Sequence, residues 1–384
     1  MALRRPLARS VAATSVAVVV LASSLVSQTS YTHYFGNLHA HTSFSDGSGT
    51  PEEAFAQARQ HLDFIAVTEH NHPEAERGAK DRVDGLLIAD DPSLYTRLKK
   101  AADAATVDDE FVAFWGQEFS TISKGNHSNV FQADAVLTFD NGDYRGLLDS
   151  LETEVVQFNH PWDNKKTPNY GYGQFKSYTK LRQAAENNVR LIEVINGPGT
   201  KNNTGLHATV KGEAFYKNYL SRGLRLAPSA NQDNHYFTWG DLTDARTVVL
   251  ATELSRRGLL QAIRARRCYA TTDRNLRITF TVHGAMMGKE ITSDDRDLQI
   301  EYEIADDDES HAPYTVSVVY GNPKLAGSAT EKKLVSDTGN HAGEFTVKTP
   351  HANTFIYLKV TQHPGSATKR DVAVTAPVWV LAGN

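Results

Sequence analysis

The chain has 384 residues and a formal net charge of -5 at pH 7, with 45 Asp and Glu against 40 Lys and Arg. This length is enough for a large core and fits two domains, or a barrel with an appended domain. The slight negative charge and the lack of a long run of Lys or Arg exclude an extended nucleic acid as a partner. Cys268 is the single cysteine, so an intramolecular disulfide is excluded as well.

Residues 1–30 have the pattern of a secretory signal peptide. Arg4, Arg5 and Arg9 precede the apolar stretch "VAATSVAVVVLASSLV", and small residues around Ala22 to Ser27 offer a cleavage site. We therefore expect a secreted or periplasmic protein with no stable membrane span once the signal is removed. A membrane anchor is the alternative, but the apolar stretch is short for a spanning helix.

Residues 31–274 alternate apolar runs with amphipathic segments. Strands are predicted at "YFGNLH", "LDFIAVTEH", "FVAFWGQEF", "VVQFNHP", "VRLIEVING", "LRLAPSANQDNH" and "ARTVVLA". Helices are predicted between them, and the first begins at Thr50 with Pro51 and Glu53, which form an N-cap, an N1 proline and a capping box. This alternation predicts an α/β domain built on a largely parallel sheet or a barrel.

Residues 275–384 have a different pattern. Runs such as "LRITFTVHG", "LQIEYEIA", "TVSVVYG" and "TFIYLKVTQ" alternate with polar, turn-rich segments and carry almost no helical periodicity. We therefore predict a small C-terminal antiparallel β-sandwich.

Imidazole and acidic side chains follow the predicted strands of the first domain. In an α/β barrel the ends of successive strands meet at one face, so these side chains would line one pocket. Packed together, the carboxylates would repel one another and the imidazoles would compete for protons unless cations compensated them. Imidazole and carboxylate are the usual ligands of zinc, manganese and iron, so the sequence predicts a multinuclear metal site. The candidate ligands are His39, His41, Asp46, His70, Glu118, His127, His160, Asp233 and His235.

The stretches "LHAHTSFSDG", "DFIAVTEHN", "GQE", "NHP" and "DNH" resemble the ordered motifs of the polymerase and histidinol phosphatase (PHP) superfamily. The resemblance covers about Tyr34 to Ala270. The spacing in "GQEFSTISKGNHSN" and the terminal "TAPVWV" resemble exported members related to carbaryl hydrolases. The resemblance implies a distorted (β/α)7 barrel that holds two or three divalent metal ions and hydrolyses mainly phosphoesters.

The resemblance also implies three groups of ligands. The first metal would be held by His39, His41, Glu118 and Asp233, and the second by Glu118, His127 and His160. The third would be held by Asp46, His70 and His235. Asp46 stands where some relatives have His, which leaves the occupancy of the third site open, as is the identity of the metals.

We assign the catalytic roles to Glu118, Asp233 and His235. In the expected mechanism a water that bridges the metals loses its proton and attacks phosphorus. The leaving oxygen departs on a metal, or with a proton from His235 or from a metal-bound water, and the sequence leaves these alternatives open. Asn196 and Arg246 are candidate substrate contacts, Arg246 because a guanidinium matches two phosphate oxygens. The alternative at Asn196 is that it precedes an ordinary turn at residues 197–199, and the alternative for Arg246 is a salt bridge at the start of a strand. Glu69 either orients a ligand histidine or is only a strand-end carboxylate.

The expected function is the hydrolysis of a small or exposed organophosphate ester. A metal-dependent hydrolase of carboxyl or carbamate esters or amides is the first alternative, because the same site chemistry attacks a polarised carbonyl. A secreted, metal-bearing binding module is the second. The sequence leaves the oligomeric state open.

Overall fold

The computed structural model describes residues 30–71, 87–119, 126–139, 143–162, 175, 177–363 and 370–383. Nearly all of the predicted signal peptide, residues 1–29, lies outside the described residues. Within the described ranges, no helix is both long and apolar enough to cross a membrane.

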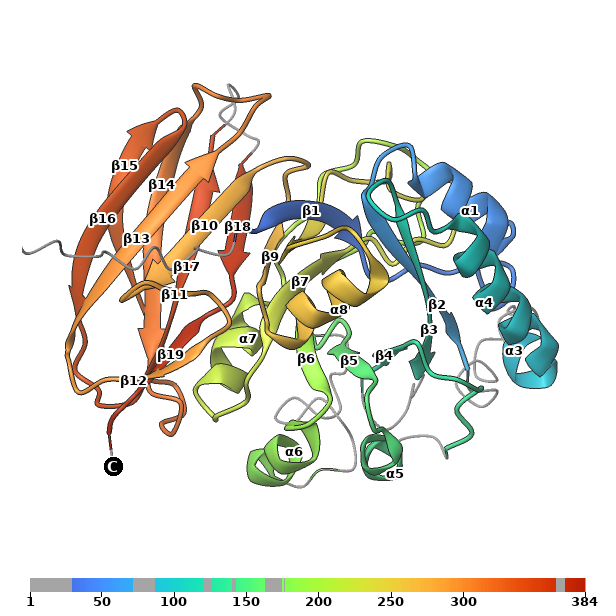
Figure 1. The fold of residues 1–384 in the computed structure, drawn as a ribbon, viewed down its shortest axis with the longest axis horizontal. Helices are drawn as coiled ribbons and strands as arrows, with labels where there is room; N and C mark the ends of the chain where they lie inside the picture. Colours follow the sequence, from blue (N-terminus) through green and yellow to red (C-terminus); the bar gives the residue numbers. More distant parts are fainter. Residues whose placement is uncertain are drawn as a thin grey trace, which may run out of the picture. The chain divides into compact units, whose positions relative to one another are not determined.

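The first part of the chain forms a curved mixed sheet in the order β8-β1-β2-β3-β4-β5-β6-β7 (Figure 1). Its strands are β1 (Thr32–Asn37), β2 (Phe64–His70), β3 (Val112–Phe119), β4 (Ser128–Phe131), β5 (Val155–Phe158), β6 (Val189–Asn196), β7 (Ala227–Asn231) and β8 (Arg246–Ala251). Strands β1 to β3 pair in parallel, as do β5 to β7. Strand β4 lies antiparallel between β3 and β5, and β8 lies antiparallel to β1. The α/β class is therefore present, but the sheet is less parallel than the alternating pattern predicts.

The two ends of this curved sheet meet through a side chain. Strand β7 lies beside β8. Thr247 Oγ1 accepts from Ala230 N at 2.9 Å and donates to Ala230 O at 2.9 Å. One hydroxyl thus takes the place of a backbone ladder between the described residues of β7 and β8. The structure supports a mixed α/β sheet that curves almost to closure, without establishing an exact (β/α)7 barrel.

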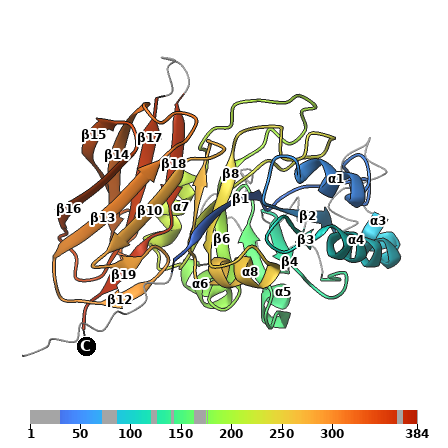
Figure 2. The same ribbon diagram turned by 45° about the horizontal axis from the view of Figure 1, so that its top comes forward.

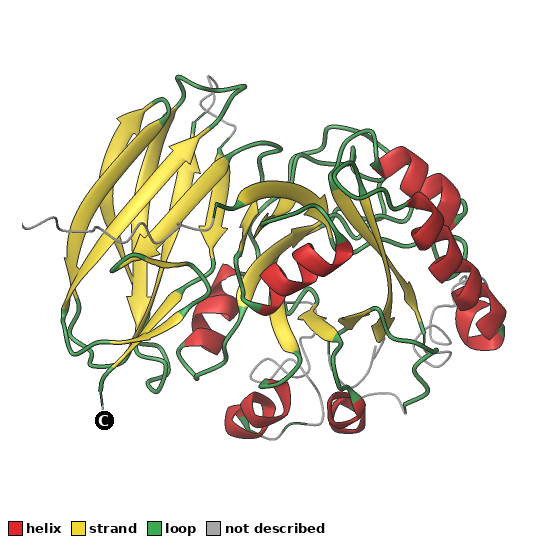
Figure 3. Ribbon diagram, viewed as in Figure 1, coloured by secondary structure: helices red, strands yellow, loops and turns green. Residues whose placement is uncertain are grey.

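Helices cover the outer side of this sheet (Figure 3). They are α1 (Pro51–Ala58), α3 (Leu87–Asp90), α4 (Pro92–Ala105), α5 (Tyr144–Ser150), α6 (Tyr178–Ala185), α7 (Glu213–Leu220) and α8 (Arg256–Arg264). The predicted capping box of α1 is present: Thr50 N donates to Glu53 Oε2 at 2.8 Å, and Glu53 N donates to Thr50 Oγ1 at 3.3 Å. The apolar face of α1, which includes Ala54 and Phe55, is buried, so burial and capping favour the same helix.

The C-terminal part is made of strands (Figure 2). They are β9 (Cys268–Thr271), β10 (Arg277–Val282), β11 (Ala285–Met286), β12 (Glu290–Thr292), β13 (Asp297–Ala305), β14 (Pro313–Gly321), β15 (Thr330–Thr338), β16 (His341–Lys348), β17 (Thr354–Gln362), β18 (Asp371–Thr375) and β19 (Val378–Leu381). One sheet has the order β11-β10-β13-β16 and is antiparallel throughout. Along β13, Leu298, Ile300, Tyr302 and Ile304 are buried while the residues between them are exposed, which is the alternation expected of a sheet with one covered face.

The second sheet of this part is continuous with the curved sheet. Strand β18 pairs antiparallel with β9, and β9 pairs with β8. The apolar core is continuous too, since Leu250 of β8, Ile278 of β10 and Leu358 of β17 belong to one cluster. Backbone pairing therefore crosses the predicted domain boundary at residue 274, and the division into 31–274 and 275–384 stays a prediction.

A small acidic group lies where β9 leads into β10. Asp273 Oδ1 accepts from the backbone N–H groups of Asn275 and Leu276, both at 2.8 Å. Asp306, also buried, approaches Asp273 so that their nearest carboxylate oxygens lie within 4.8 Å. Burial raises the pKa of Asp273 to about 6, with help from the negative charges of Asp306 and Asp371 and against the two turn hydrogen bonds. Asp273 therefore caps a turn at the cost of holding a carboxylate among like charges.

This raised pKa predicts a stability that depends on pH. The folded-state pKa of about 6 lies above the ordinary value of 3.8, so folding takes up a proton between these values. The protonated Asp273 carboxyl contributes to the free energy of unfolding. This stabilising contribution is fully present below pH 3.8 and is lost as the pH rises through 6. It amounts to at most about 3 kcal/mol.

We expect Asp273→Asn to raise the free energy of unfolding at pH 7.5 and to flatten its decrease between pH 5 and pH 7.5, because Asn keeps the turn acceptor and loses the charge. Urea denaturation across this pH range measures both effects. Asp149→Asn, at an exposed position on α5, is the control and should leave the pH dependence of the wild type unchanged. A variant Asp273→Asn with the wild-type pH slope would show that this carboxyl does not titrate in the range.

Candidate metal centre

The candidate ligands lie along one edge of the curved sheet. His39 and His41 follow β1, His70 ends β2, Glu118 is near the end of β3, and His160 follows β5. Because β4 runs antiparallel, its start lies at the same edge, which puts His127 beside the ends of its neighbours. The turn after β7 adds Asp233 and His235. The short strand β4, which the sequence pattern did not predict, is what turns His127 toward the others.

The His39–His41 segment is fixed between two neighbouring strands. His41 N donates to Asn234 O at 2.8 Å, and Thr68 N donates to Ala40 O at 2.8 Å. The segment thus continues β1 between β2 and the turn after β7. In extended backbone, residues i and i+2 point to the same face, so the two imidazoles emerge side by side.

Four side chains form the tightest group. His39 Nε2 and His41 Nε2 lie 3.2 Å apart, and each lies 3.2 Å from Asp233 Oδ1. The carboxylate of Glu118 spans both, with Oε1 at 3.2 Å from His39 Nε2 and Oε2 at 3.3 Å from His41 Nε2. Ligand atoms bound tetrahedrally at the 2.0–2.1 Å typical of zinc lie about 3.3 Å from one another. The two imidazole nitrogens therefore lie from each other and from both carboxylates at the spacing that the ligands of a small divalent ion have.

Glu118 extends this group toward further imidazoles. Its Oε1 lies 3.1 Å from His127 Nδ1 and 3.2 Å from His160 Nε2, while its Oε2 lies 3.1 Å from His70 Nδ1. His70, Glu118 and His127 also form a group whose donor atoms are mutually close enough to hold an ion. Both oxygens of Glu118 thus face histidines on more than one side, as a carboxylate shared by two metals must.

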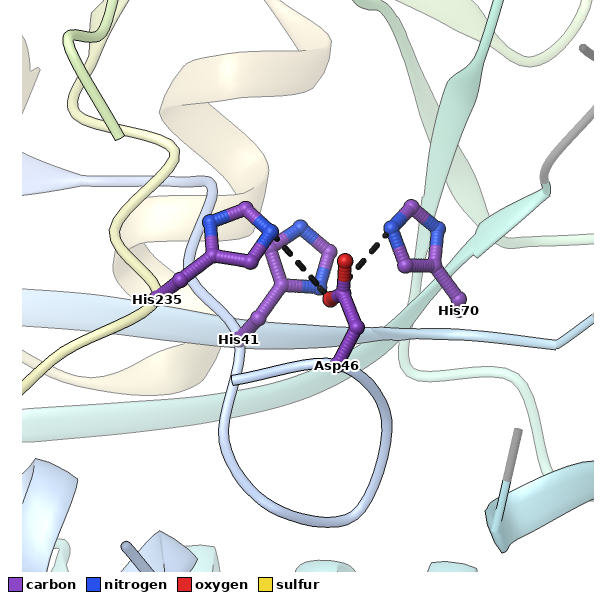
Figure 4. Close-up of side chains that lie close together, drawn as sticks. All are labelled: His41, Asp46, His70 and His235. Carbon is purple, nitrogen blue, oxygen red and sulfur yellow. Dashed lines mark ion pairs between the residues drawn. The ribbon is translucent and has the colours of Figure 1, made fainter. Parts of the chain in front are cut away.

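Asp46 centres a third group, drawn in Figure 4 with His41, His70 and His235. Asp46 Oδ1 lies 3.1 Å from His235 Nε2 and 3.5 Å from His70 Nε2. His70 therefore stands between two groups, with Nδ1 toward Glu118 and Nε2 toward Asp46. The sequence analysis assigned His70 to the third site alone. In the structure His70 also faces Glu118, which belongs to the other two groups.

The protonation of the cluster follows from burial and close opposite charges. Burial lowers the pKa of His41, but Asp233 and Glu118 outweigh it and raise that pKa to about 10. Burial raises the pKa of Glu118, yet His39, His127 and His70 hold it well below its ordinary value. For His70, by contrast, burial dominates and lowers the pKa to about 3. The carboxylates stay ionised while the imidazoles cannot all take protons, so the cluster favours cations other than protons.

Hydrogen bonds on the far side of two histidines fix which ring nitrogen faces the cluster. His235 Nδ1 donates to Asp233 O at 2.7 Å, which turns Nε2 toward Asp46. His39 Nδ1 donates to Glu193 Oε1 at 2.9 Å, which leaves Nε2 toward Glu118 and Asp233. This tautomer is the one that metal-ligating histidines need.

Glu193, in the middle of β6, is a residue that the sequence analysis missed. It is fully buried, and besides His39 it accepts from His160 N at 2.7 Å and from Asn231 Nδ2 at 2.9 Å. Asn159 continues this network, donating to Glu118 Oε1 at 2.8 Å. The available signal was a charged residue in the otherwise apolar run "LIEVI", since an ionised group in a buried strand needs partners.

Glu69 does not contact a ligand histidine through a hydrogen bond. Instead it accepts from Thr42 N at 3.0 Å and from the hydroxyls of Thr42 and Ser45. Glu69 is fully buried, and burial raises its pKa. Its contacts hold the loop that carries Asp46 after the His39–His41 segment.

The turn after β7 has a strained backbone. Asp233 has φ +52, a left-handed conformation that is uncommon outside glycine. Gly199 packs against it so closely that a Cβ there would lie 1.7 Å from Asp233 O. A side chain at residue 199 would therefore displace Asp233 and His235.

The two candidate substrate residues lie in different surroundings. Asn196 Nδ2 donates to Glu193 Oε2 at 2.8 Å and lies 3.4 Å from Asp233 Oδ2, at the border of the cluster. Arg246 is buried, and its guanidinium donates to the backbone oxygens of Thr243, Ala245 and Gly240. Arg246 thus supports the turn before β8, and its role as a phosphate contact stays a prediction.

The fold and the cluster define a mixed α/β protein with histidine and carboxylate groups that could hold divalent metal ions. No family model matches the chain. Two curated relatives, uncharacterized proteins of Chlamydia muridarum and Chlamydia trachomatis serovar D, are 26% identical over 228 and 217 residues. The matches cover 50% of this chain and 34% of each relative, so the chain spans about a third of their length.

One solved structure is similar over most of the chain. It is a two-domain protein from Bacteroides vulgatus that contains a predicted PHP-like metal-dependent phosphoesterase. It covers 90% of this chain and 95% of its own, with a TM-score of 0.46 and 18% sequence identity. At this level of similarity the side-chain geometry, and not the neighbour, carries the functional argument.

Proposed function

We propose that the chain is a metal-dependent hydrolase of the PHP type that cleaves phosphoric esters of small or exposed organophosphates. The observation that carries the proposal is that Nε2 of His39 and Nε2 of His41 lie 3.2 to 3.3 Å from each other and from carboxylate oxygens of Glu118 and Asp233. Two or three zinc, manganese or iron ions fit the three groups of donors. The proposal includes export by the predicted signal peptide of residues 1–30.

Within this proposal the chain's own residues hold the metal ions and orient the ligand side chains. Glu118 joins the groups through its two oxygens, and Glu193 keeps His39 in the required tautomer. Divalent ions bound there would polarise the phosphoryl group and lower the pKa of a nearby water. His235 acts at Nε2, because its Nδ1 is occupied by Asp233 O. Asn196, beside the second oxygen of Asp233, is proposed to touch the substrate.

A carboxyl or carbamate ester hydrolase is the second candidate, and Arg246 is the observation that favours it. Arg246 is the candidate phosphate contact of the sequence analysis, but its guanidinium donates instead to three backbone carbonyls. A phosphoester substrate gains most from a dedicated cation, whereas a polarised carbonyl needs none beyond the metals.

Turnover on matched chromogenic esters separates the candidates. The purified protein is loaded separately with zinc, manganese or iron and assayed on a phosphomonoester, a phosphodiester and a carboxyl ester that release the same nitrophenol. Phosphoester cleavage that a chelator abolishes is the expected result. Cleavage of the carboxyl ester alone would transfer the protein to the second candidate class, and no turnover with any metal would favour a binding module.

A further inference from the structure

A polar cavity lies at the opposite edge of the sheet from the metal centre. It has a volume of about 440 Å³, and it is lined by the residues before β7, the start of β6, and parts of α6, β12 and β19. Val189 begins β6 and Leu226 precedes β7, whereas Asn196 and Asp233 mark the other ends of these strands. The cavity and the histidine cluster are therefore separated by the length of the strands.

Arginines dominate this cavity. Arg182, Arg225 and Arg266 line it, against the carboxylates of Glu186 and Glu290. Arg225 pairs with Glu290, with Nη2 at 2.9 Å from Oε2 and Nε donating to the same oxygen at 3.0 Å. The lining therefore carries a net positive charge.

Arg266 makes no ion pair with Glu186 or Glu290, both of which the structure describes, and Glu290 acts on it only through a longer-range electrostatic effect. Its Nε donates to Arg225 O at 2.6 Å, and no carboxylate of the described residues forms an ion pair with its guanidinium. It lies 5.7 Å from the ring centroid of Trp379, on which Arg225 also stacks at 5.1 Å. Burial, together with the charges of Arg190 and Arg225, lowers the pKa of Arg266 to about 10 against the opposite effect of Glu290.

The position of Arg266 is set by the backbone around it. The residue has φ +58, directly after the end of α8, and Gly288 packs against it. A Cβ at Gly288 would lie 2.6 Å from the carbonyl carbon of Arg266. The guanidinium is therefore positioned near Trp379 by a tight turn, without an ion pair to a carboxylate of the described residues.

We propose that this cavity binds a small oxyanion of the phosphate or phosphate-ester class, through Arg266 with Arg225 and Arg182. Guanidinium groups bind such anions through paired, charge-assisted hydrogen bonds. A cavity of about 440 Å³ has room for a phosphate that carries an organic group, because ligand pockets span about 300 to 1,000 Å³. The bound anion would offset the repulsion between Arg225 and Arg266. It would also join the residues before β7 to Trp379 of β19.

Calorimetric titration of the full-length protein with inorganic phosphate, at constant ionic strength, tests this site. Because phosphate also has affinity for metal centres, the titration is done on the wild type and on Glu118→Ala. We expect both to show the same phosphate affinity at the arginine cavity. Arg266→Gln should weaken that affinity by about tenfold, since one charge-assisted pair is lost. Arg257→Gln, at a highly exposed position on α8, should leave it unchanged.

Arg182→Gln serves as a second variant, because Arg182 is exposed and its loss does not threaten folding. If Arg266→Gln fails to fold, Arg182→Gln decides the question by a measurable loss of phosphate affinity. Wild-type affinity in the folded variants of both arginines would overturn the proposal. So would loss of all phosphate binding in Glu118→Ala, which would assign the anion to the metal centre.

Discussion

Glu118→Gln is expected to lower turnover by more than about 100-fold, beyond the 10- to 100-fold effects typical of residues that only support metal ligands. The physical reason is that both oxygens of Glu118 face imidazoles: Oε1 faces His39, His127 and His160, and Oε2 faces His41 and His70. Glutamine keeps the shape but removes the charge and replaces one oxygen by an N–H donor. That donor would point at nitrogen atoms or at a cation.

Turnover on the ester panel and the metal content of the purified variant should fall together. The far-UV circular dichroism spectrum is compared in parallel, because loss of metal also removes its contribution to folding. His207→Ala, at an exposed position outside the cluster, is the matched control and should retain both turnover and metal. A folded Glu118→Gln protein with wild-type turnover would refute the assignment of the catalytic centre.

Glu193→Gln is expected to weaken metal binding by about 10- to 100-fold while the protein stays folded. Glu193 receives the Nδ1 proton of His39 and the backbone N–H of His160, one on each oxygen. Glutamine can accept only one of these two hydrogen bonds, and it lacks the negative charge that makes His39 a stronger ligand. Competition with a chelator of known affinity measures the change.

A purely structural role for Glu193 would lower the melting temperature without changing metal affinity in the folded protein, so both quantities are measured. Glu193→Ala is the harsher variant: it leaves the buried donors of His39 and His160 without an acceptor, at about 1–3 kcal/mol each, whereas Asn231 keeps Gln157 as an acceptor. Glu152→Gln, at an exposed position before β5, controls for the loss of one negative charge. Equal metal affinity in Glu193→Gln and wild type would exclude a positioning role.

Most strands of the fold follow from apolar runs in the sequence. Strands β2, β3, β5, β6, β7 and β8 each fall within a predicted run, because burial on both faces requires continuous apolar residues. Strand β1 overlaps its predicted run but begins two residues earlier. Strands β4 and β9 were missed, since "SNVF" and "CYAT" are short and carry no such pattern. The antiparallel direction of β8 was also not predictable. Strand direction depends on the path of the connections and leaves no mark on the side chains of the strand itself.

The metal-binding hypothesis could be drawn from the sequence for a related reason. Histidine and carboxylate residues directly after apolar strands are costly to bury unless they bind something, so their positions alone point to a common site. By itself, therefore, the sequence determined the α/β class, the candidate donor residues and the metal-binding hypothesis.

Only the tertiary structure decided how these residues are grouped. His70 stands between Asp46 and Glu118, Arg246 is engaged by backbone carbonyls, and Glu193 lies behind His39. The grouping around His70 and Glu193 joins residues that lie far apart in the sequence. It is set by strand register and by the curvature that brings β7 beside β8. A linear pattern specifies which side chains a strand carries, but distances of about 3 Å between strands arise only when the whole sheet packs.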